Sequence, residues 1–311
     1  MGANRPNRFR ACVRSATGPT KPANDAGFSP QSPADWRLLS VGPDLLAQHA
    51  VLGAVAFMVM SMTAAPACEG LRDGPKGTVT EIVDGDTLLL DTGRVVRLIG
   101  IQAPKLALGR DGYEDWPKAN EAKAALTALT LKKPVLLRFG GEDVDRHGRT
   151  LAQVFVQGEP QVWVQQAMLG QGQARVYSFP DNRACLPELM AAETRARAGG
   201  LGIWADSYYS VRRGDRPGKL LELAGRYELV EGRVLKAERL GGQVFLNFGR
   251  YYKEDFTAVI DARALRMFGD IGFDPLKLSG ALVRVRGWIE DRDGPRVPVT
   301  HPEQIEVLAV Q

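Results

Sequence analysis

The sequence predicts a mainly β protein with packed helices, an α+β fold built from two small barrels in succession. Short alternating segments bounded by turn residues recur in both halves of the chain, and runs with helical spacing lie between them. The length of 311 residues also suits about two domains. A composition with 44% hydrophobic and 24% charged residues is that of an ordinary globular protein.

The first half of the chain contains the more regular pattern. Alternation and β-branched residues predict strands at 77–83, 87–90, 95–101, 135–139 and 151–156. Helical spacing predicts helices at 117–131, 162–169 and 186–198. These elements indicate a strand-rich barrel with helices folded against it.

The second half repeats this plan after a polar stretch at 212–218, which we interpret as a linker. Strands are predicted at 227–237, 243–248 and 255–260, a helix at 262–268, and further strands at 281–289 and 304–307. Three strands, a helix and two strands is the order of an OB-like barrel.

Three motifs in the first half carry the chemistry. Val83-Asp84-Gly85-Asp86-Thr87 contains an Asp-Gly turn between two predicted strands, which by itself is a common hairpin. The segment 97–104, RLIGIQAP, follows on the next strand. The segment 145–149, DRHGR, comes immediately before the strand at 151–156.

Together with 177–180 and Gly202-Ile203-Trp204, these segments resemble the staphylococcal nuclease family. The resemblance covers residues 75–210 and implies an OB-like barrel of the staphylococcal nuclease type. Residues 222–311 are then expected to form a second OB-like barrel. The family is a family of phosphodiester hydrolases, so the resemblance implies a nucleic acid, DNA or RNA, as partner.

The resemblance also assigns roles to individual residues. It implies that Asp86 binds a calcium ion, and that Arg97 and Arg149 hold the phosphate as catalytic residues. Arginine suits this role because its planar fork donates paired hydrogen bonds and stays charged. Arg146 and His147 stand where the family holds a terminal phosphate. The family also places aromatic residues against a base, which here are Tyr177 and its neighbour Phe179; a place in the core is an equal alternative for them.

The match departs from the family at two positions, Gln102 and Lys105. Gln102 replaces the second carboxylate metal ligand, whereas Ala103 can still offer the backbone oxygen that its position supplies in the family. Hard cations bind weakly without carboxylates. Lys105 stands at the general-base position, where a protonated lysine cannot accept a proton from water. It adds a third cation, which favours phosphate binding.

Two functions therefore remain open. The first is a nuclease-like protein that binds nucleic acid and hydrolyses phosphodiester bonds with a divalent cation. The second is a catalytically impaired module that binds nucleic acid or another anion. A third class, an interaction protein of the cell envelope, would lack salt-sensitive binding to DNA. The net charge of +4 suits a polyanionic partner without identifying one, and we expect a monomer.

One strand of the second half alternates basic and aromatic residues. Arg284, Arg286 and Trp288 share a face of the predicted strand at 281–289. Such a face suits single-stranded nucleic acid. The same alternation also fits a plain surface between domains or toward a partner.

The N-terminal region is expected to be absent from the mature protein. Residues 1–48 show no sustained period and are interpreted as disordered or non-mature. Residues 49–67 contain an apolar run and then small residues, as in a signal peptide or an uncleaved signal anchor. Export to the periplasm or the medium follows, without a transmembrane span in the mature form.

Export bears on the cysteines. Cleavage after Ala67 would leave Cys68 and Cys185 as the cysteines of the mature chain. Cysteines in an oxidising compartment can pair, so we expect a disulfide between them, with two unpaired thiols as the alternative.

Overall fold

The computed structural model describes residues 68–310, which fall within one compact unit. The expected N-terminal extension and signal segment, 1–48 and 49–67, therefore lie outside the described residues.

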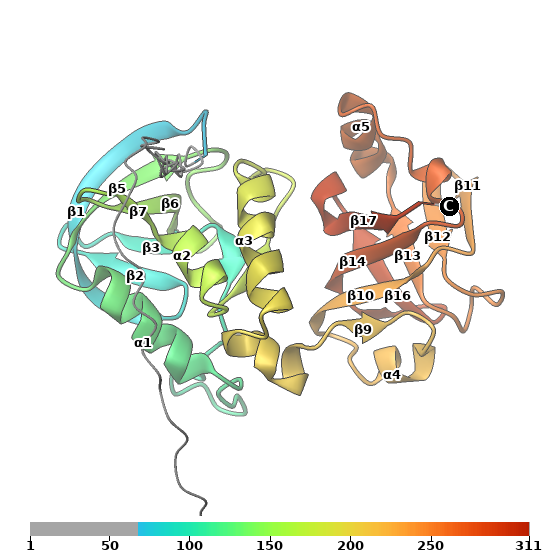
Figure 1. Ribbon diagram of the computed structural model, residues 1–311, viewed down its shortest axis with the longest axis horizontal. Helices are drawn as coiled ribbons and strands as arrows, with labels where there is room; N and C mark the ends of the chain where they lie inside the picture. The colour runs from blue at the N-terminus through green and yellow to red at the C-terminus, as the bar shows by residue number, and fades with distance from the viewer. Residues whose placement is uncertain (1–67, 311) are drawn as a thin grey trace, which may run out of the picture. The chain divides into compact units, whose positions relative to one another are not determined.

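The first barrel is a closed sheet of β1 (Arg72–Asp84), β2 (Thr87–Leu90), β3 (Val95–Leu98), β5 (Pro134–Phe139) and β6 (Thr150–Val156). The strands follow the order β3-β2-β1-β5-β6, and a parallel pairing of β3 with β6 closes the barrel (Figure 1). The short strand β7 (Val162–Trp163) extends β6. The expected α+β fold with an OB-like first barrel is confirmed.

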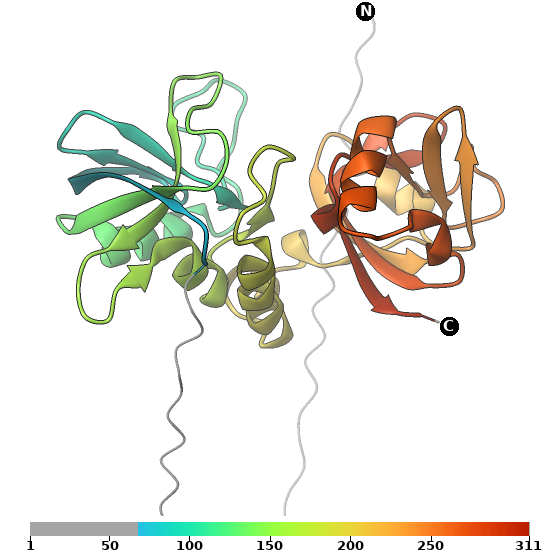
Figure 2. The same cartoon turned by 90° about the horizontal axis from the view of Figure 1, so that it is seen from above.

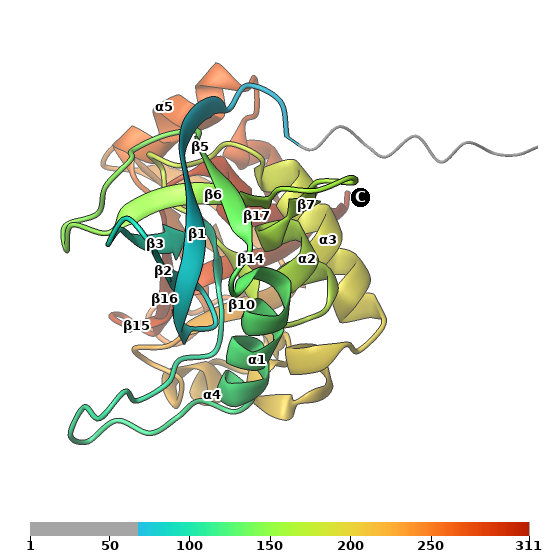
Figure 3. The ribbon, with the colours of Figure 1, turned by 90° about the vertical axis from the view of Figure 1, so that its left-hand side faces the viewer.

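Three helices cover this barrel. They are α1 (Ala119–Thr130), α2 (Val164–Gly170) and α3 (Leu186–Ala198), and each packs against its neighbour in the series (Figure 3). Helix α1 also packs on β1 and α2 on β6. Their buried residues, such as Leu126, Met168 and Leu189, join the core formed by the strands. Burying such side chains stabilises each by roughly 1.5–3 kcal/mol.

The strand predicted at 95–101 is broken in the structure. It ends as β3 at Leu98 and resumes as β4 (Gly100–Gln102), which pairs with β8 (Arg175–Tyr177) instead of the barrel. The break is possible because Gly100 has a φ of 86°, in the region that favours glycine. In this pairing Gln102 lies opposite Arg175.

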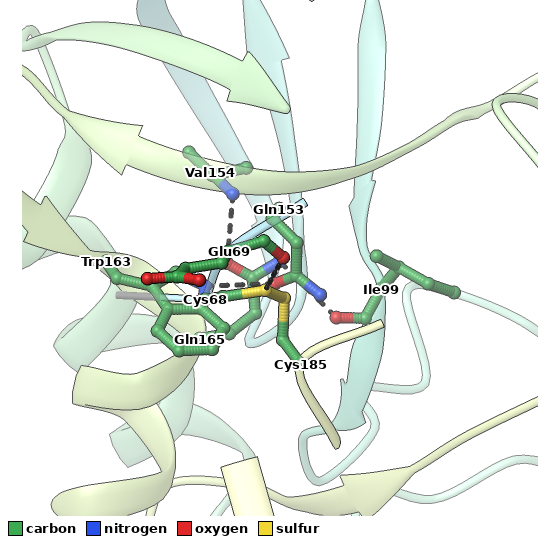
Figure 4. The surroundings of a disulfide bond; sticks show 8 residues. All are labelled: Cys68, Glu69, Ile99, Gln153, Val154, Trp163, Gln165 and Cys185. Carbon is green, nitrogen blue, oxygen red and sulfur yellow. Dashed lines mark hydrogen bonds between the residues drawn. A yellow bond between two sulfur atoms is a disulfide. The ribbon is translucent and has the colours of Figure 1, made fainter. Parts of the chain in front are cut away.

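A disulfide joins Cys68 to Cys185, with Cα atoms 5.2 Å apart. It connects the residues that precede β1 to the start of α3. Figure 4 shows the bridge beside two buried amides. Gln153 accepts a hydrogen bond from Trp163 Nε1, and Gln165 accepts one from the backbone N–H of Val154.

The second barrel, residues 227–309, consists of two sheets. The strands are β10 (Tyr227–Arg233), β11 (Lys236–Leu240), β12 (Gln243–Asn247), β13 (Thr257–Ile260), β14 (Leu282–Trp288), β15 (Glu290–Asp291), β16 (Pro295–Val299) and β17 (Ile305–Ala309). Their orders are β17-β14-β10-β9 and β11-β12-β13-β16-β15, in which β9 (Arg212–Arg213) precedes the barrel in sequence. Helix α5 (Ala262–Asp270), orange in Figure 2, lies between β13 and β14 in sequence. The parallel pairing of β13 with β16 matches that of β3 with β6 in the first barrel.

The second half differs from the expectations in several places. The strand expected at 227–237 is divided into β10 and β11. The stretch 212–218 is no free linker, because it forms β9 (Arg212–Arg213), paired with β10, and the start of α4 (Pro217–Leu221). Strand β16 was missed because Pro295 and Pro298 interrupt the usual strand signal. Single 3-10 turns complete the fold, at Gly202–Ala205, Ser207–Tyr209, Pro275–Leu278 and Pro302–Gln304.

The basic face expected on β14 lies mostly against other residues. Arg286 is fully buried and pairs with Glu193 of α3, with Nη2 2.8 Å from Oε2. It also pairs with Glu306 of β17. Arg284 pairs with Glu231 at 2.8 Å. This face is therefore mainly a surface between the barrels, and Trp288 is its exposed member.

Candidate nucleic-acid-binding site

The Asp84–Thr87 turn is held by its own side chains. Asp84 Oδ1 accepts a hydrogen bond from the backbone N–H of Asp86 at 3.0 Å. A side chain at Gly85 would collide with Ala103 and Ala122, because an added Cβ would lie 2.6 Å and 2.8 Å from their Cβ atoms. Glycine thus lets the turn approach Ala103, whose N–H donates to Asp86 Oδ2 at 2.8 Å.

Lys105 places its ammonium directly on this turn. Its Nζ lies 2.6 Å and 2.7 Å from the two carboxylate oxygens of Asp86 and 3.2 Å from Asp84 Oδ2. The Asp86 side chain is fully buried. Burial alone would raise its pKa, but Arg97 and Lys105 hold the pKa of Asp86 well below its usual range. Burial, and then the charge of Asp86, raise the pKa of Asp84.

Arg97 is fixed beside the same carboxylate. Its Nη2 lies 3.3 Å from Asp86 Oδ2 and donates to the carbonyl of Ile101 at 2.7 Å. Its Nη1 donates to the carbonyl of Leu98 at 2.5 Å. The guanidinium is nearly buried and keeps one orientation at the wall of the site.

Gln102 is engaged elsewhere. Its Oε1 accepts hydrogen bonds from Arg175 Nε at 3.0 Å and Nη2 at 2.8 Å. Both residues are buried, and the guanidinium of Arg175 lies 4.9 Å from the ring centre of Tyr227 in the second barrel. The amide oxygen is therefore the acceptor for a buried arginine.

These contacts do not fit a calcium site. A calcium ion needs several oxygen ligands at about 2.3–2.6 Å. Here the ammonium of Lys105 lies against both oxygens of Asp86, and the oxygen of Gln102 is bonded to Arg175. Among residues 68–310, no three His, Cys, Asp or Glu side chains lie in positions to hold a metal ion. The expected ligand set Asp86, Gln102 and Ala103 is thus not arranged around a cation.

The second phosphate position lies on the loop before β6. Gly148, with φ of 77°, allows a tight turn in which Asp145 accepts hydrogen bonds from the backbone and Nε of Arg149 at 2.9 Å and 2.7 Å. These bonds outweigh burial and lower the pKa of Asp145. Arg149 is half-buried, whereas Arg146 and His147 are exposed and share a contact of 3.1 Å.

Aromatic residues gather next to this loop. The rings of Tyr177 and Phe179 meet edge to face with centres 4.8 Å apart. Tyr177 also meets Trp288 of the second barrel at 6.5 Å, and Trp288 Nε1 donates to its hydroxyl at 3.2 Å. Tyr177 is half-buried, while Phe179 is exposed.

Many of these residues line one cavity of about 710 Å³, which we call the cleft. Its lining includes the cations Arg97, Lys105, Arg146 and Arg149, with His147, and the acids Glu142, Asp145 and Asp181. It also includes Gln102, Tyr177, Phe179 and Trp288. The structure therefore brings the predicted phosphate-binding and aromatic residues together in the cleft. Asp86 contacts two of the lining residues, Arg97 and Lys105.

Sequence reasoning missed two contributors to this site. Asp84 contacts Lys105 and could have been found, because it is the first acid of the Asp-Gly-Asp turn. Arg175 had no motif to mark it, since its partner Gln102 is 73 residues away in sequence.

The first barrel is similar in sequence to staphylococcal nuclease homologues. A family model described as staphylococcal nuclease homologue matches residues 95–206. Protein ParB of Escherichia coli is 36% identical over 169 residues, which are 51% of this chain and 87% of that protein. Thermonuclease of Staphylococcus intermedius is 32% identical over 136 residues, 42% of this chain and 77% of that protein. Endonuclease YncB of Bacillus subtilis is 29% identical over 142 residues, 44% of this chain and 65% of that protein.

No helix within 68–310 is both long and apolar enough to cross a membrane.

Proposed function

The chain belongs to the staphylococcal nuclease homologue family, and from this premise we propose that it binds the phosphodiester backbone of nucleic acid in the cleft without a divalent cation. One observation carries the proposal. The Lys105 ammonium lies 2.6 Å and 2.7 Å from the two oxygens of Asp86, where it serves as a cation that is part of the chain.

The positively charged residues of the cleft support binding of the nucleic-acid backbone. Arg97 and Arg149 are both held by fixed hydrogen bonds, so little side-chain freedom is lost when a phosphate arrives. Asp145 orients Arg149 and leaves it half-buried at the cleft wall. The exposed Arg146 adds positive charge, which attracts phosphates over a distance set by the salt concentration.

Hydrolysis is a second candidate. It is favoured by the retention of Asp84, Asp86, Arg97 and Arg149 in one site, and by relatives named as endonucleases. Against it stands Lys105, which is paired with two carboxylates and cannot serve as a base while protonated. Losing a general base typically slows a reaction by about 10²–10⁴-fold.

Binding and cleavage can be measured together. The oxidised full chain is incubated with labelled DNA and RNA oligonucleotides in calcium or in chelator, over a range of salt. We expect binding that weakens with salt, is equal with calcium and with chelator, and yields no cleavage. Arg149→Ala should reduce the slope of log affinity against log salt by about 1. Lys118→Ala, which alters an exposed lysine paired with Glu121, is the control.

Either of two results would contradict this proposal. Calcium-dependent cleavage that is lost in Arg149→Ala would establish the hydrolase instead. Binding that is absent at low salt would exclude a nucleic-acid partner altogether.

We also propose that the protein acts outside the reducing cytoplasm, in the periplasm or the medium. The disulfide between Cys68 and Cys185 supports this, because disulfides persist in oxidising compartments. N-terminal sequencing of the mature protein tests it: a start close to Cys68 is expected, and an intact Met1 would contradict cleavage.

A further inference from the structure

We propose that Trp288 of the second barrel is a stacking platform for a base of the nucleic acid, so that the binding site spans both barrels and takes single-stranded chains. The proposal rests on the function proposed above. Trp288 lies outside the family match at 95–206 and outside the first barrel, and so belongs to this chain rather than to the family site.

The first support is where Trp288 lies. It is the last residue of β14, and it lines the same cleft as Arg97 and Arg149. Its side chain is large and apolar, yet the residue is 42% exposed. Phe179, on the first barrel, lines the cleft too and is 38% exposed. Cations for phosphates and open aromatic surfaces for bases thus share one cavity.

The second support is how the ring is held. Trp288 meets Tyr177 and Tyr227 edge to face, with ring centres 6.5 Å and 6.1 Å apart. Its Nε1 donates to the hydroxyl of Tyr177, so its polar atom already has a partner. The exposed remainder of the side chain is apolar ring, the surface on which a base stacks.

The third support is the rigidity of its strand. Arg286, two residues earlier on the same face of β14, forms a fully buried ion pair with Glu193 and a second pair with the half-buried Glu306. Trp288 itself lies opposite Tyr227 of β10 in the antiparallel pairing of β10 with β14. The hydroxyl of Tyr227 in turn donates to the carbonyl of Val176 in β8 at 3.4 Å. The platform is therefore fixed before the ligand arrives, which lowers the cost of binding.

These features select the class of nucleic acid. An aromatic platform beside a basic groove is the way in which proteins bind single strands, because every base has a face to stack. The bases of a duplex are stacked on one another and are unavailable. Single-stranded DNA or RNA is therefore the expected ligand, with its phosphates toward Arg97 and Arg149 and a base on Trp288.

The test distinguishes stacking of bases on Trp288 from contacts with phosphates. Fluorescence anisotropy measures binding of the full chain to an oligothymidylate of about 12 nucleotides and to an abasic sugar–phosphate strand of the same length. Trp288→Ala should weaken binding to oligothymidylate by about 5- to 150-fold and leave binding to the abasic strand unchanged. Trp288→Phe should retain most of the affinity. Tyr252→Ala, an aromatic residue of the second barrel that is 60% exposed, should match the wild type.

A second readout does not depend on the stability of the alanine variant. Oligothymidylate should quench the tryptophan fluorescence of the wild type, and Trp288→Phe should remove that part of the quenching. Equal losses for both ligands, or no loss for either, would overturn the platform while leaving phosphate binding in place. If the wild type binds neither strand, the proposed function itself has failed.

Discussion

Lys105 changes the charge balance of the site at the level of single residues. Asp84 and Asp86 carry two carboxylates, and Lys105 and Arg97 bring two cations to them. The carboxylates are therefore already neutralised within the chain. An external divalent cation would have to displace the Lys105 ammonium from these carboxylates. Because this ammonium is covalently attached to the chain, we expect it to compete well against a free ion.

Removal of Lys105 should expose this competition. In Lys105→Ala, Asp84 and Asp86 lose their shared partner, so we expect a loss of about 1–3 kcal/mol in the free energy of unfolding at neutral pH. Calcium should restore part of that stability, because it would bind the freed carboxylates. Thermal unfolding with calcium and with chelator measures both effects.

The control is Lys118→Ala, which removes an exposed lysine from a pair with Glu121. It should change neither stability nor the response to calcium by a measurable amount. If the wild type were stabilised by calcium as much as Lys105→Ala, the ammonium would not be excluding the ion.

The sequence could predict which residues meet in the site better than it could predict their bonds. The resemblance to the family placed Asp86, Arg97 and Arg149 in one site, and in the structure Arg97 contacts Asp86 and lines the cleft with Arg149. The hydrogen bond from Arg175 to Gln102 could not be predicted from the sequence, because it depends on the pairing of β4 with β8. The contact of Lys105 with Asp84 and Asp86 likewise depends on how the chain turns after β4.

At the scale of the elements, the disulfide secures the beginning of the first barrel. Cys68 precedes β1 and Cys185 precedes α3, and 117 residues separate them. Both cysteines are buried and belong to the core of the first barrel. The bridge therefore ties the first strand of the barrel to its last helix.

Loss of this bridge should weaken the fold. The double variant Cys68→Ser/Cys185→Ser should lose roughly 2–4 kcal/mol of unfolding free energy, because its unfolded chain is less constrained. Denaturant unfolding measures this loss. A reducing agent should lower the midpoint of the wild type to that of the variant and leave the variant unaffected. A wild-type midpoint that does not respond to reductant would show that the bridge is absent in solution.

The elements of the fold were largely predictable, and the exceptions have local causes. Helix α3 has the predicted bounds, and β2 does as well. The break at Gly100 was missed because an apolar run gives no sign of where a strand leaves a barrel. Strand β16 was missed because its two prolines resemble a loop.

At the scale of the whole molecule, the two barrels share buried polar residues. His301 of the second barrel is buried, and its Nε2 lies 2.7 Å from the hydroxyl of Ser178, between Tyr177 and Phe179. Arg183 pairs with Glu303 at 2.8 Å nearby. Glu193 and Arg286 add a pair that is fully buried. Unfolding of one barrel would leave these groups of the other without partners.

His301 should make stability depend on pH. Burial lowers its pKa to about 4, below the value of about 6.5 expected when the chain is unfolded. The unfolded chain therefore binds the extra proton first as the pH falls. The free energy of unfolding should drop by up to about 3 kcal/mol between pH 6.5 and pH 4.

Denaturant unfolding at a series of pH values measures that drop. His301→Asn should flatten the profile in this range, because the ionising group is gone. His147→Asn, which alters an exposed histidine, should keep the profile of the wild type. A wild-type profile that is already flat between pH 6.5 and pH 4 would mean that His301 titrates equally in both states.

The number of barrels was predictable from the sequence, and their association was not. From the sequence, Arg284 and Arg286 fitted either a nucleic-acid face or a surface between domains or toward a partner, because alternation alone does not identify what covers a strand. Their partners Glu193, Glu231 and Glu306 lie on different elements. Only the folded chain reveals that the arginines are paired.

The stack of Gln102, Arg175 and Tyr227 has a consequence for the ancestry of the protein. Gln102, which the resemblance places at a metal-ligand position, is bonded to Arg175, whose guanidinium lies against the ring of Tyr227 in the second barrel. The three positions should therefore have changed together during descent. Among relatives, we expect glutamine at position 102 to accompany arginine at 175 and a C-terminal barrel with an aromatic residue at 227. Chains that end after the first barrel should keep the carboxylate.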